Sequence, residues 1–191
     1  MIFFPCESSV LTGKESLPER WILTKLNTAA KQINQALEGR EFAKSTQISY
    51  RYLYDELFDV YIENSKSIIS DGTPDEARSA KDTLYTAIES GLRMVAPFMP
   101  FLTEELWQRL PRRPGDNTAS ITIVNYPEYE SSFHDPKSEM AYELVLGITN
   151  PRTYLRLPVN VDTSLIPFSW RFLFDIQYVL QKTVSQTLAA H

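Results

Sequence analysis

The chain has 191 residues, 43% of them hydrophobic, and a formal net charge of −5 with a pI near 5.1. This length suits one domain of moderate size or one domain with an appendage, and the apolar share can fill a sizeable core. The acidic balance is not typical of a dedicated nucleic-acid binder, so any such contact must come from a local basic patch. The single cysteine, Cys6, excludes an internal disulfide and favours a reducing, cytoplasmic setting.

The inventory of reactive side chains is small. One cysteine and two histidines make a poor metal-binding set, so neither a metal nor another cofactor is predicted. The sequence contains no run of about 18 apolar residues, which argues against a membrane span.

Two capping boxes mark the starts of helices. Ser16 with Glu19 opens a helix whose apolar residues recur at steps of three and four over 22–37, with Gly39 as its expected end. A second helical pattern covers 41–69. Thr73 with Glu76 then opens a helix that reaches Val95. In this helix Gly91 indicates a close helix crossing.

The stretch 91–111 predicts a rigid corner. Pro97 and Pro100 must break the helix between Val95 and Phe101. Because six large apolar residues crowd this break, we expect it to be buried. These are Met94, Val95, Phe98, Met99, Phe101 and Leu102. Thr103 is the expected N-cap of a short helix that stops at Pro111.

Downstream of Pro111 the pattern changes. Residues 112–116 predict a turn, and 120–125 alternate as a short strand or extended segment. Asp135 and Pro136 open a further helix that ends before Pro151. The prediction is an all-α antiparallel helical bundle over 1–147, followed by a divergent extension over 148–191 that ends in a helix packed on the bundle.

Five collinear segments carry a family resemblance. They are LTGKESLPERWILTKLN (11–27), NQALEGREF (34–42), YLYDELFDVYIENSK (52–66), LYTAIESGLRMVAPFMPFLTEELWQRLPRRPGD (84–116) and SEMAYELVLG (138–147). In order and spacing they resemble the anticodon-binding domain of class I valyl-tRNA synthetases, and their sequences are most similar to the cytosolic fungal type. The resemblance implies a helical bundle that holds the anticodon stem and loop of a tRNA.

The signatures of the catalytic domain in that family, HIGH and KMSKS, do not occur in the 191 residues. We therefore expect no tRNA charging by this chain alone, and interpret it as a stand-alone or truncated derivative, a truncated paralogue. Its expected partner is a tRNA of the valine type or a protein, in the cytoplasm. Homo-oligomerisation is expected if an apolar face stays open.

Six residues are candidates for RNA contact. Arg112 and Arg113 form the densest basic point and could grip phosphates, although a solvated turn explains them equally well. The others are Lys66 near a helix end, Arg93, Arg40, and Tyr54 in a tyrosine-rich stretch. Helix-dipole stabilisation explains the lysine without RNA, and core packing explains the tyrosine.

A second hypothesis is a repurposed bundle that acts as a small-molecule enzyme, for example in specialised metabolism, through a pocket opened by loss of the upstream domains. Its candidate catalytic residues are Asp55, Asp59 and Glu63, four apart on one helical face, with His134. The resemblance favours ordinary ion pairs for the carboxylates. His134 lacks a nucleophile in a recognisable setting, so it supports no triad.

Overall fold

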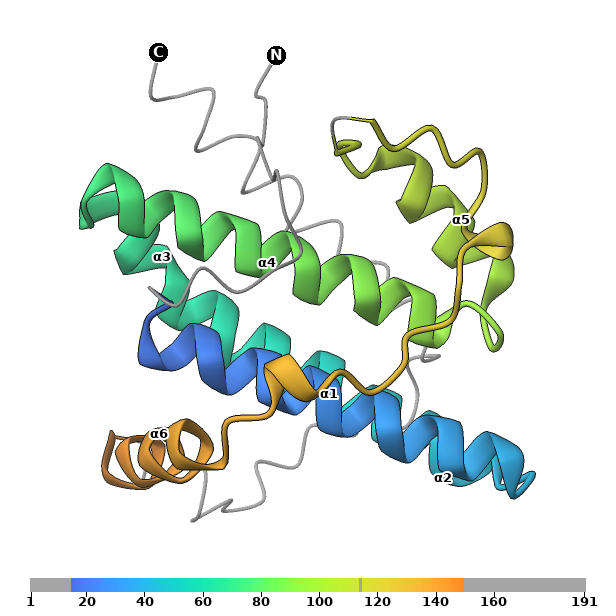
Figure 1. Ribbon diagram of the computed structural model, residues 1–191, viewed down its shortest axis with the longest axis horizontal. Helices are drawn as coiled ribbons and strands as arrows, with labels where there is room; N and C mark the ends of the chain where they lie inside the picture. The colour runs from blue at the N-terminus through green and yellow to red at the C-terminus, as the bar shows by residue number, and fades with distance from the viewer. Residues whose placement is uncertain (1–14, 114, 150–191) are drawn as a thin grey trace, which may run out of the picture.

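A computed structural model describes residues 15–113 and 115–149, with side chains to residue 146 (Figure 1). These ranges are helical and contain no strand, which confirms the all-α class. The elements are α1 (Leu17–Glu38), α2 (Phe42–Tyr50), the π-helical η1 (Arg51–Ile62), α3 (Glu63–Asp71), α4 (Pro74–Val95), α5 (Pro100–Arg109), the 3-10 turns η2 (Ile121–Ile123) and η3 (Ser131–Phe133), and α6 (Pro136–Thr149). No helix within the described ranges has both the length and the apolar character needed to cross a bilayer.

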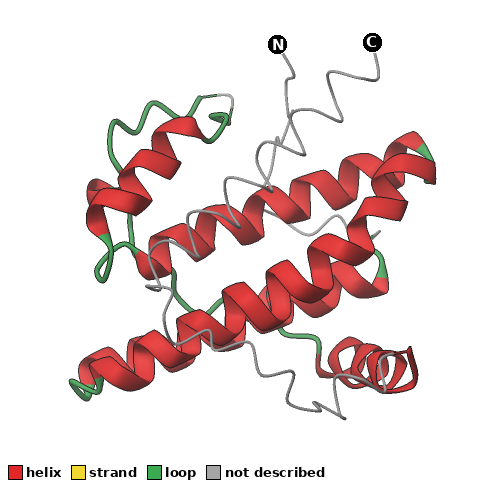
Figure 2. Ribbon diagram, turned by 180° about the vertical axis from the view of Figure 1, so that it is seen from behind, coloured by secondary structure: helices red, strands yellow, loops and turns green. Residues whose placement is uncertain are grey.

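Three long rods make the bundle. α1 is the first, α2, η1 and α3 continue into one another as the second, and α4 is the third (Figures 1 and 2). Consecutive rods run antiparallel, as the sequence predicts. α1 contacts both of the other rods, α5 leaves from the end of α4, and α6 packs on α1.

Both predicted capping boxes are present. The Thr73 hydroxyl accepts the amide of Glu76 at 3.4 Å, and the Glu76 carboxylate accepts the amide of Thr73 at 2.9 Å. At α1 the Glu19 carboxylate accepts the Ser16 amide at 3.1 Å and the Ser79 hydroxyl at 2.7 Å. Glu19 is only 1% exposed, so one carboxylate both caps α1 and ties that helix to α4.

The core lies between the three rods and extends under α5. Its largest fully buried side chains include Trp107, Tyr52, Tyr61, Ile22, Ile33, Leu53, Leu57 and Leu92. Gly91 lies where α4 crosses η1, because a Cβ atom there would sit 2.8 Å from Cδ2 of Leu53. The close crossing predicted from this glycine is therefore confirmed.

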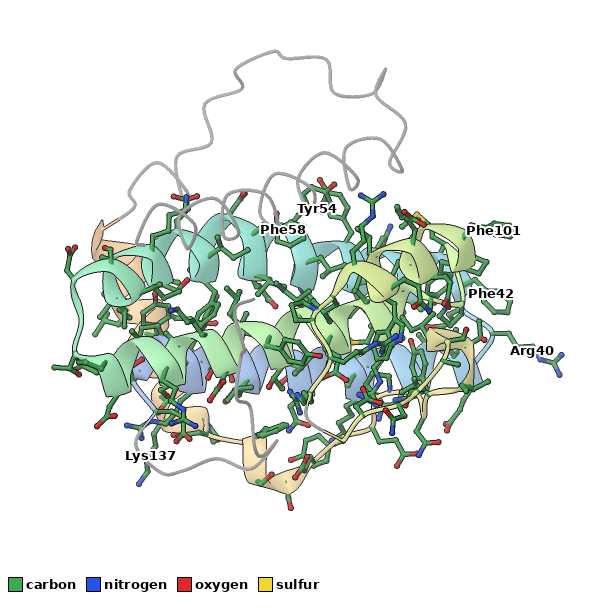
Figure 3. All side chains as sticks on the ribbon, turned by 90° about the horizontal axis from the view of Figure 1, so that it is seen from above. Arg40, Phe42, Tyr54, Phe58, Phe101 and Lys137 are labelled. Carbon is green, nitrogen blue, oxygen red and sulfur yellow. The ribbon has the colours of Figure 1, made fainter. Side chains whose placement is uncertain are left out.

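The corner between α4 and α5 follows the prolines, but two details were wrong. α4 ends at Val95 and α5 begins at Pro100, inside the predicted break. Phe101, expected to be buried, is 91% exposed, since the first turn of α5 directs it away from the bundle (Figure 3). Thr103 is no N-cap: its hydroxyl donates to the Met99 carbonyl at 2.9 Å from inside the helix. The helix starts earlier because proline is tolerated in a first turn.

A long loop links α5 to α6. It runs from Asp116 to Asp135 and passes across α1 (Figure 1). Within this loop, η3 contacts α1. Residues 120–125, predicted as a short strand or an extended segment, form one 3-10 turn with extended flanks and no strand, because the Ser120 hydroxyl accepts the Thr122 amide at 3.2 Å and closes a tight turn.

α6 docks on α1 through charge. The Lys25 ammonium lies 2.7 Å from the Glu139 carboxylate and 2.6 Å from that of Glu143. The outer face of α6 is apolar, with Met140 73% and Leu144 68% exposed. The predicted unit 148–191 lies almost wholly outside the described residues, so the domain boundary stays a prediction.

Candidate nucleic-acid interface

Arg113 is held on α4 by three kinds of contact. Its guanidinium lies 4.7 Å from the ring centroid of Tyr85. Its Nη2 donates to the Thr86 hydroxyl at 2.9 Å and lies 3.3 Å from the Glu89 carboxylate. Burial raises the pKa of Tyr85 to about 12, so this ring stays neutral beside the cation at physiological pH. The side chain keeps 19% of its surface exposed.

Arg112 is held in the same way on α5. Its guanidinium lies 4.6 Å from the ring centroid of Trp107, and its Nη1 is 3.9 Å from the Asp116 carboxylate. Hydrogen bonds from Thr118 hold the pKa of Asp116 below its usual value, so this counter-ion is charged at neutral pH. Arg112 and Arg113 therefore each lie against an aromatic ring and are not freely solvated.

Arg93 joins this group through Glu89. Its Nη1 is 3.9 Å from the same carboxylate that faces Arg113. Three guanidinium groups thus pair with two carboxylates, Glu89 and Asp116. We call these five residues the arginine corner. It unites three of the six predicted RNA-contact residues.

The other three predicted residues lie elsewhere. Lys66 pairs with Glu63 one turn earlier on α3. Arg40 projects from the end of α1 (Figure 3). It adopts φ 59°, and it rather than Gly39 is the left-handed residue that ends the helix, with the Glu41 amide donating to the Ala36 carbonyl at 2.7 Å.

Tyr54 is 4% exposed and belongs to an aromatic row. Its ring stacks on Tyr50 at 4.5 Å between centroids and meets the edge of Phe58 at 5.6 Å. A ring so placed packs the bundle, and base stacking by Tyr54 stays a prediction that would need its neighbours to move.

The four candidate residues of the enzyme hypothesis do not converge on one site. Asp55, Asp59 and Glu63 are exposed on the second rod, whereas His134 follows η3 and its ring lies 6.2 Å from that of Tyr129. Within the described ranges no group of three His, Cys, Asp or Glu side chains has the arrangement of a metal site. The observations do not favour the enzyme hypothesis.

Sequence reasoning overlooked Glu56, the inward-facing neighbour of Asp55. Its side chain is 15% exposed, 3.8 Å from the Arg51 guanidinium, and burial raises its pKa to about 7. The helical pattern places position 56 between positions 52 and 53 around the helix, and both of these carry large apolar side chains, a signal that could have marked it as half-buried.

This raised pKa predicts a pH dependence of stability. The folded state favours protonated Glu56, so its contribution is complete below the ordinary pKa of 4.5 and is lost as the pH rises through about 7. The free energy of unfolding should fall by on the order of 2 kcal/mol from this group over that range. Urea unfolding of the wild type and Glu56→Gln at pH 5 and pH 8 measures it. Equal pH slopes in both proteins would contradict the assignment.

A sequence model of the family "Anticodon-binding domain of tRNA ligase" matches residues 19–165, which covers the bundle except for the first two residues of α1 and includes the arginine corner. The chain belongs to this family. The anticodon-binding domain is 46% identical over 157 residues to the mitochondrial valine–tRNA ligase of Saccharomyces cerevisiae, covering 82% of the chain and 14% of that protein.

Two further relatives agree with this assignment. The valine–tRNA ligase of Schizosaccharomyces pombe is 43% identical over 148 residues, 78% of this chain and 15% of the relative. The human valine–tRNA ligase is 41% identical over 160 residues, 83% of this chain and 13% of the relative. The anticodon-binding domain thus spans about one seventh of the length of these relatives, with fungal and animal proteins at similar identity.

The structure also reveals an ordered loop that sequence reasoning left without a role. In this anticodon-binding domain, three polar side chains of α1, two of them buried, bind the backbone of residues 127–135, and Tyr129 stands exposed on that loop. The signal that could have found it is the polar stripe Thr24, Asn27 and Asn34 on α1, a helix whose buried residues are mostly apolar.

Proposed function

We propose that this chain is a tRNA-binding module of the valyl-tRNA synthetase type, and that its 191 residues do not charge tRNA by themselves. The observation that carries the proposal is the family match over residues 19–165, with relatives whose names specify valine–tRNA ligases. The arginine corner supplies chemistry that suits this role, because guanidinium groups bind phosphate oxygens in a paired geometry.

The aromatic rings beneath Arg112 and Arg113 explain how the arginine corner would bind RNA. Arg112 and Arg113 each lie against a ring, so their guanidinium planes have a fixed orientation before RNA arrives. Each guanidinium has five N–H donors, more than its observed partners use. A fixed orientation reduces the entropy lost on binding. The corner would therefore position a phosphate backbone, and base recognition would belong to other residues.

A titration with a valine tRNA transcript at several salt concentrations tests this function. We expect a saturable complex at low salt, with the logarithm of the binding constant falling linearly with the logarithm of the salt concentration. A transcript with the same fold and a different anticodon reports how much of the affinity depends on the anticodon. Absence of a saturable complex at low salt would contradict tRNA binding.

Aminoacylation is tested in parallel. Supplied with valine, ATP and the transcript, the chain should yield no charged tRNA, whereas addition of an active valine–tRNA ligase should restore charging. The cytoplasmic location, the truncated character, a protein partner and a homo-oligomer stay predictions alongside this proposal. The printed name of the S. cerevisiae relative places that protein in mitochondria.

A further inference from the structure

The loop between η2 and α6 is fixed to α1 by polar side chains, two of which are almost completely buried. Asn27, 2% exposed, donates to the Glu130 carbonyl at 2.8 Å and accepts the Glu130 amide at 2.7 Å. Thr24, fully buried, donates to the Phe133 carbonyl at 3.0 Å and accepts the Asp135 amide at 3.3 Å. Asn34 donates to the Pro127 carbonyl at 2.8 Å. The loop backbone is therefore anchored along its length.

This anchored loop presents an aromatic ring to solvent. Tyr129 is 42% exposed although both of its chain neighbours lie in the anchored segment. The Lys31 ammonium lies 5.1 Å from the centroid of the Tyr129 ring, and the exposed His134 ring lies 6.2 Å from it at an interplanar angle of 56°. Two rings and one cation from α1 and the loop thus meet. We call Lys31, Tyr129 and His134 the loop platform.

From this geometry we propose that the loop platform binds an unpaired nucleobase, with Tyr129 stacking on the base and Lys31 contacting the adjoining phosphate. Stacking on an aromatic side chain and a nearby cation are the two elements by which proteins hold single-stranded RNA. A ring fixed in advance loses little conformational entropy when a base stacks on it. This assignment rests on the proposed tRNA binding and adds a second contact, to unpaired residues rather than to a helical backbone.

The charges around the ring favour a base over a second phosphate. Glu128 and Glu130 are both exposed in the same loop, and the Glu130 carboxylate accepts the Ser132 hydroxyl at 2.7 Å. Two carboxylates disfavour a cluster of phosphates but can accept hydrogen bonds from the amino groups of bases. One lysine beside two acids suits a single nucleotide with its base on the ring.

The test uses the full chain and a valine anticodon stem-loop RNA that carries 2-aminopurine in the loop, because the fluorescence of that base changes when it stacks. Tyr129→Ala should weaken binding by about 5- to 100-fold and abolish the fluorescence change, as loss of one stacked base predicts. Tyr129→Phe keeps the ring and should bind within about twofold of the wild type. Lys31→Gln should lower the salt slope by about one.

A blunt duplex made from the stem alone has no unpaired base, so its affinity should not respond to Tyr129→Ala. Met140→Ala, which removes an exposed apolar side chain from α6, is the surface control and should leave both affinities unchanged. Wild-type affinity of Tyr129→Ala for the stem-loop would overturn the loop platform while leaving tRNA binding intact. Absence of binding by the wild type would overturn both.

Discussion

Replacing Trp107 with alanine should lower the free energy of unfolding by about 3–5 kcal/mol, the usual cost of removing a large aromatic side chain from a core. Trp107 is 1% exposed and is the largest of the fully buried side chains. It lies on α5, which contacts α4 and η2, so its loss should release α5 from the bundle. Urea unfolding followed by far-ultraviolet circular dichroism measures the change.

The control for this variant lies on the same helix. Phe101→Ala also removes an aromatic ring from α5, but Phe101 is 91% exposed, so its unfolding free energy should stay within about 0.5 kcal/mol of the wild type. Similar losses in the two variants would mean that α5 is placed wrongly. Trp107→Ala should also weaken RNA binding beyond its effect on stability, because it removes the ring beneath Arg112.

Local signals determined most of the fold. Capping boxes at Ser16 and Thr73 located two helix starts, and proline chemistry located the corner at Pro97 and Pro100. These signals act over three or four residues, so they can be read without knowing the tertiary structure. Phe101 shows the limit, because hydrophobicity alone cannot specify which side of a short helix faces the core.

The site was less predictable because it depends on contacts between distant segments. Arg112 and Arg113 stand out as a basic pair in the sequence, but Tyr85, Thr86 and Glu89 lie more than 20 residues earlier on α4. The loop platform joins Lys31 to Tyr129 across a still longer separation. The sequence alone identifies candidate cations by residue type, whereas the aromatic rings and carboxylates that hold them can be identified only from the packed helices.

The second large effect concerns the arginine corner. Arg112→Gln combined with Arg113→Gln should weaken binding of the valine tRNA transcript by about 150-fold or more at low salt, because two hydrogen-bonding contacts to charged groups contribute about 1.5–3 kcal/mol each. The slope of log affinity against log salt should become shallower by about two, one for each lost phosphate contact. Filter binding at four salt concentrations measures both quantities.

A matched set of single variants separates RNA contact from support of the fold. Lys137→Gln removes an exposed cation that projects from α6, so it should alter affinity far less than either arginine (Figure 3). Glu89→Gln removes the counter-ion shared by Arg93 and Arg113 and should destabilise the fold.

Glu89→Gln should not weaken RNA binding, because the arginine corner gains positive charge when this carboxylate is neutralised. If the arginine variants lose RNA affinity while Glu89→Gln gains it, and all of these variants lower the free energy of unfolding, the guanidinium groups contact RNA. A parallel loss of affinity in all of them would show that the corner acts only through folding.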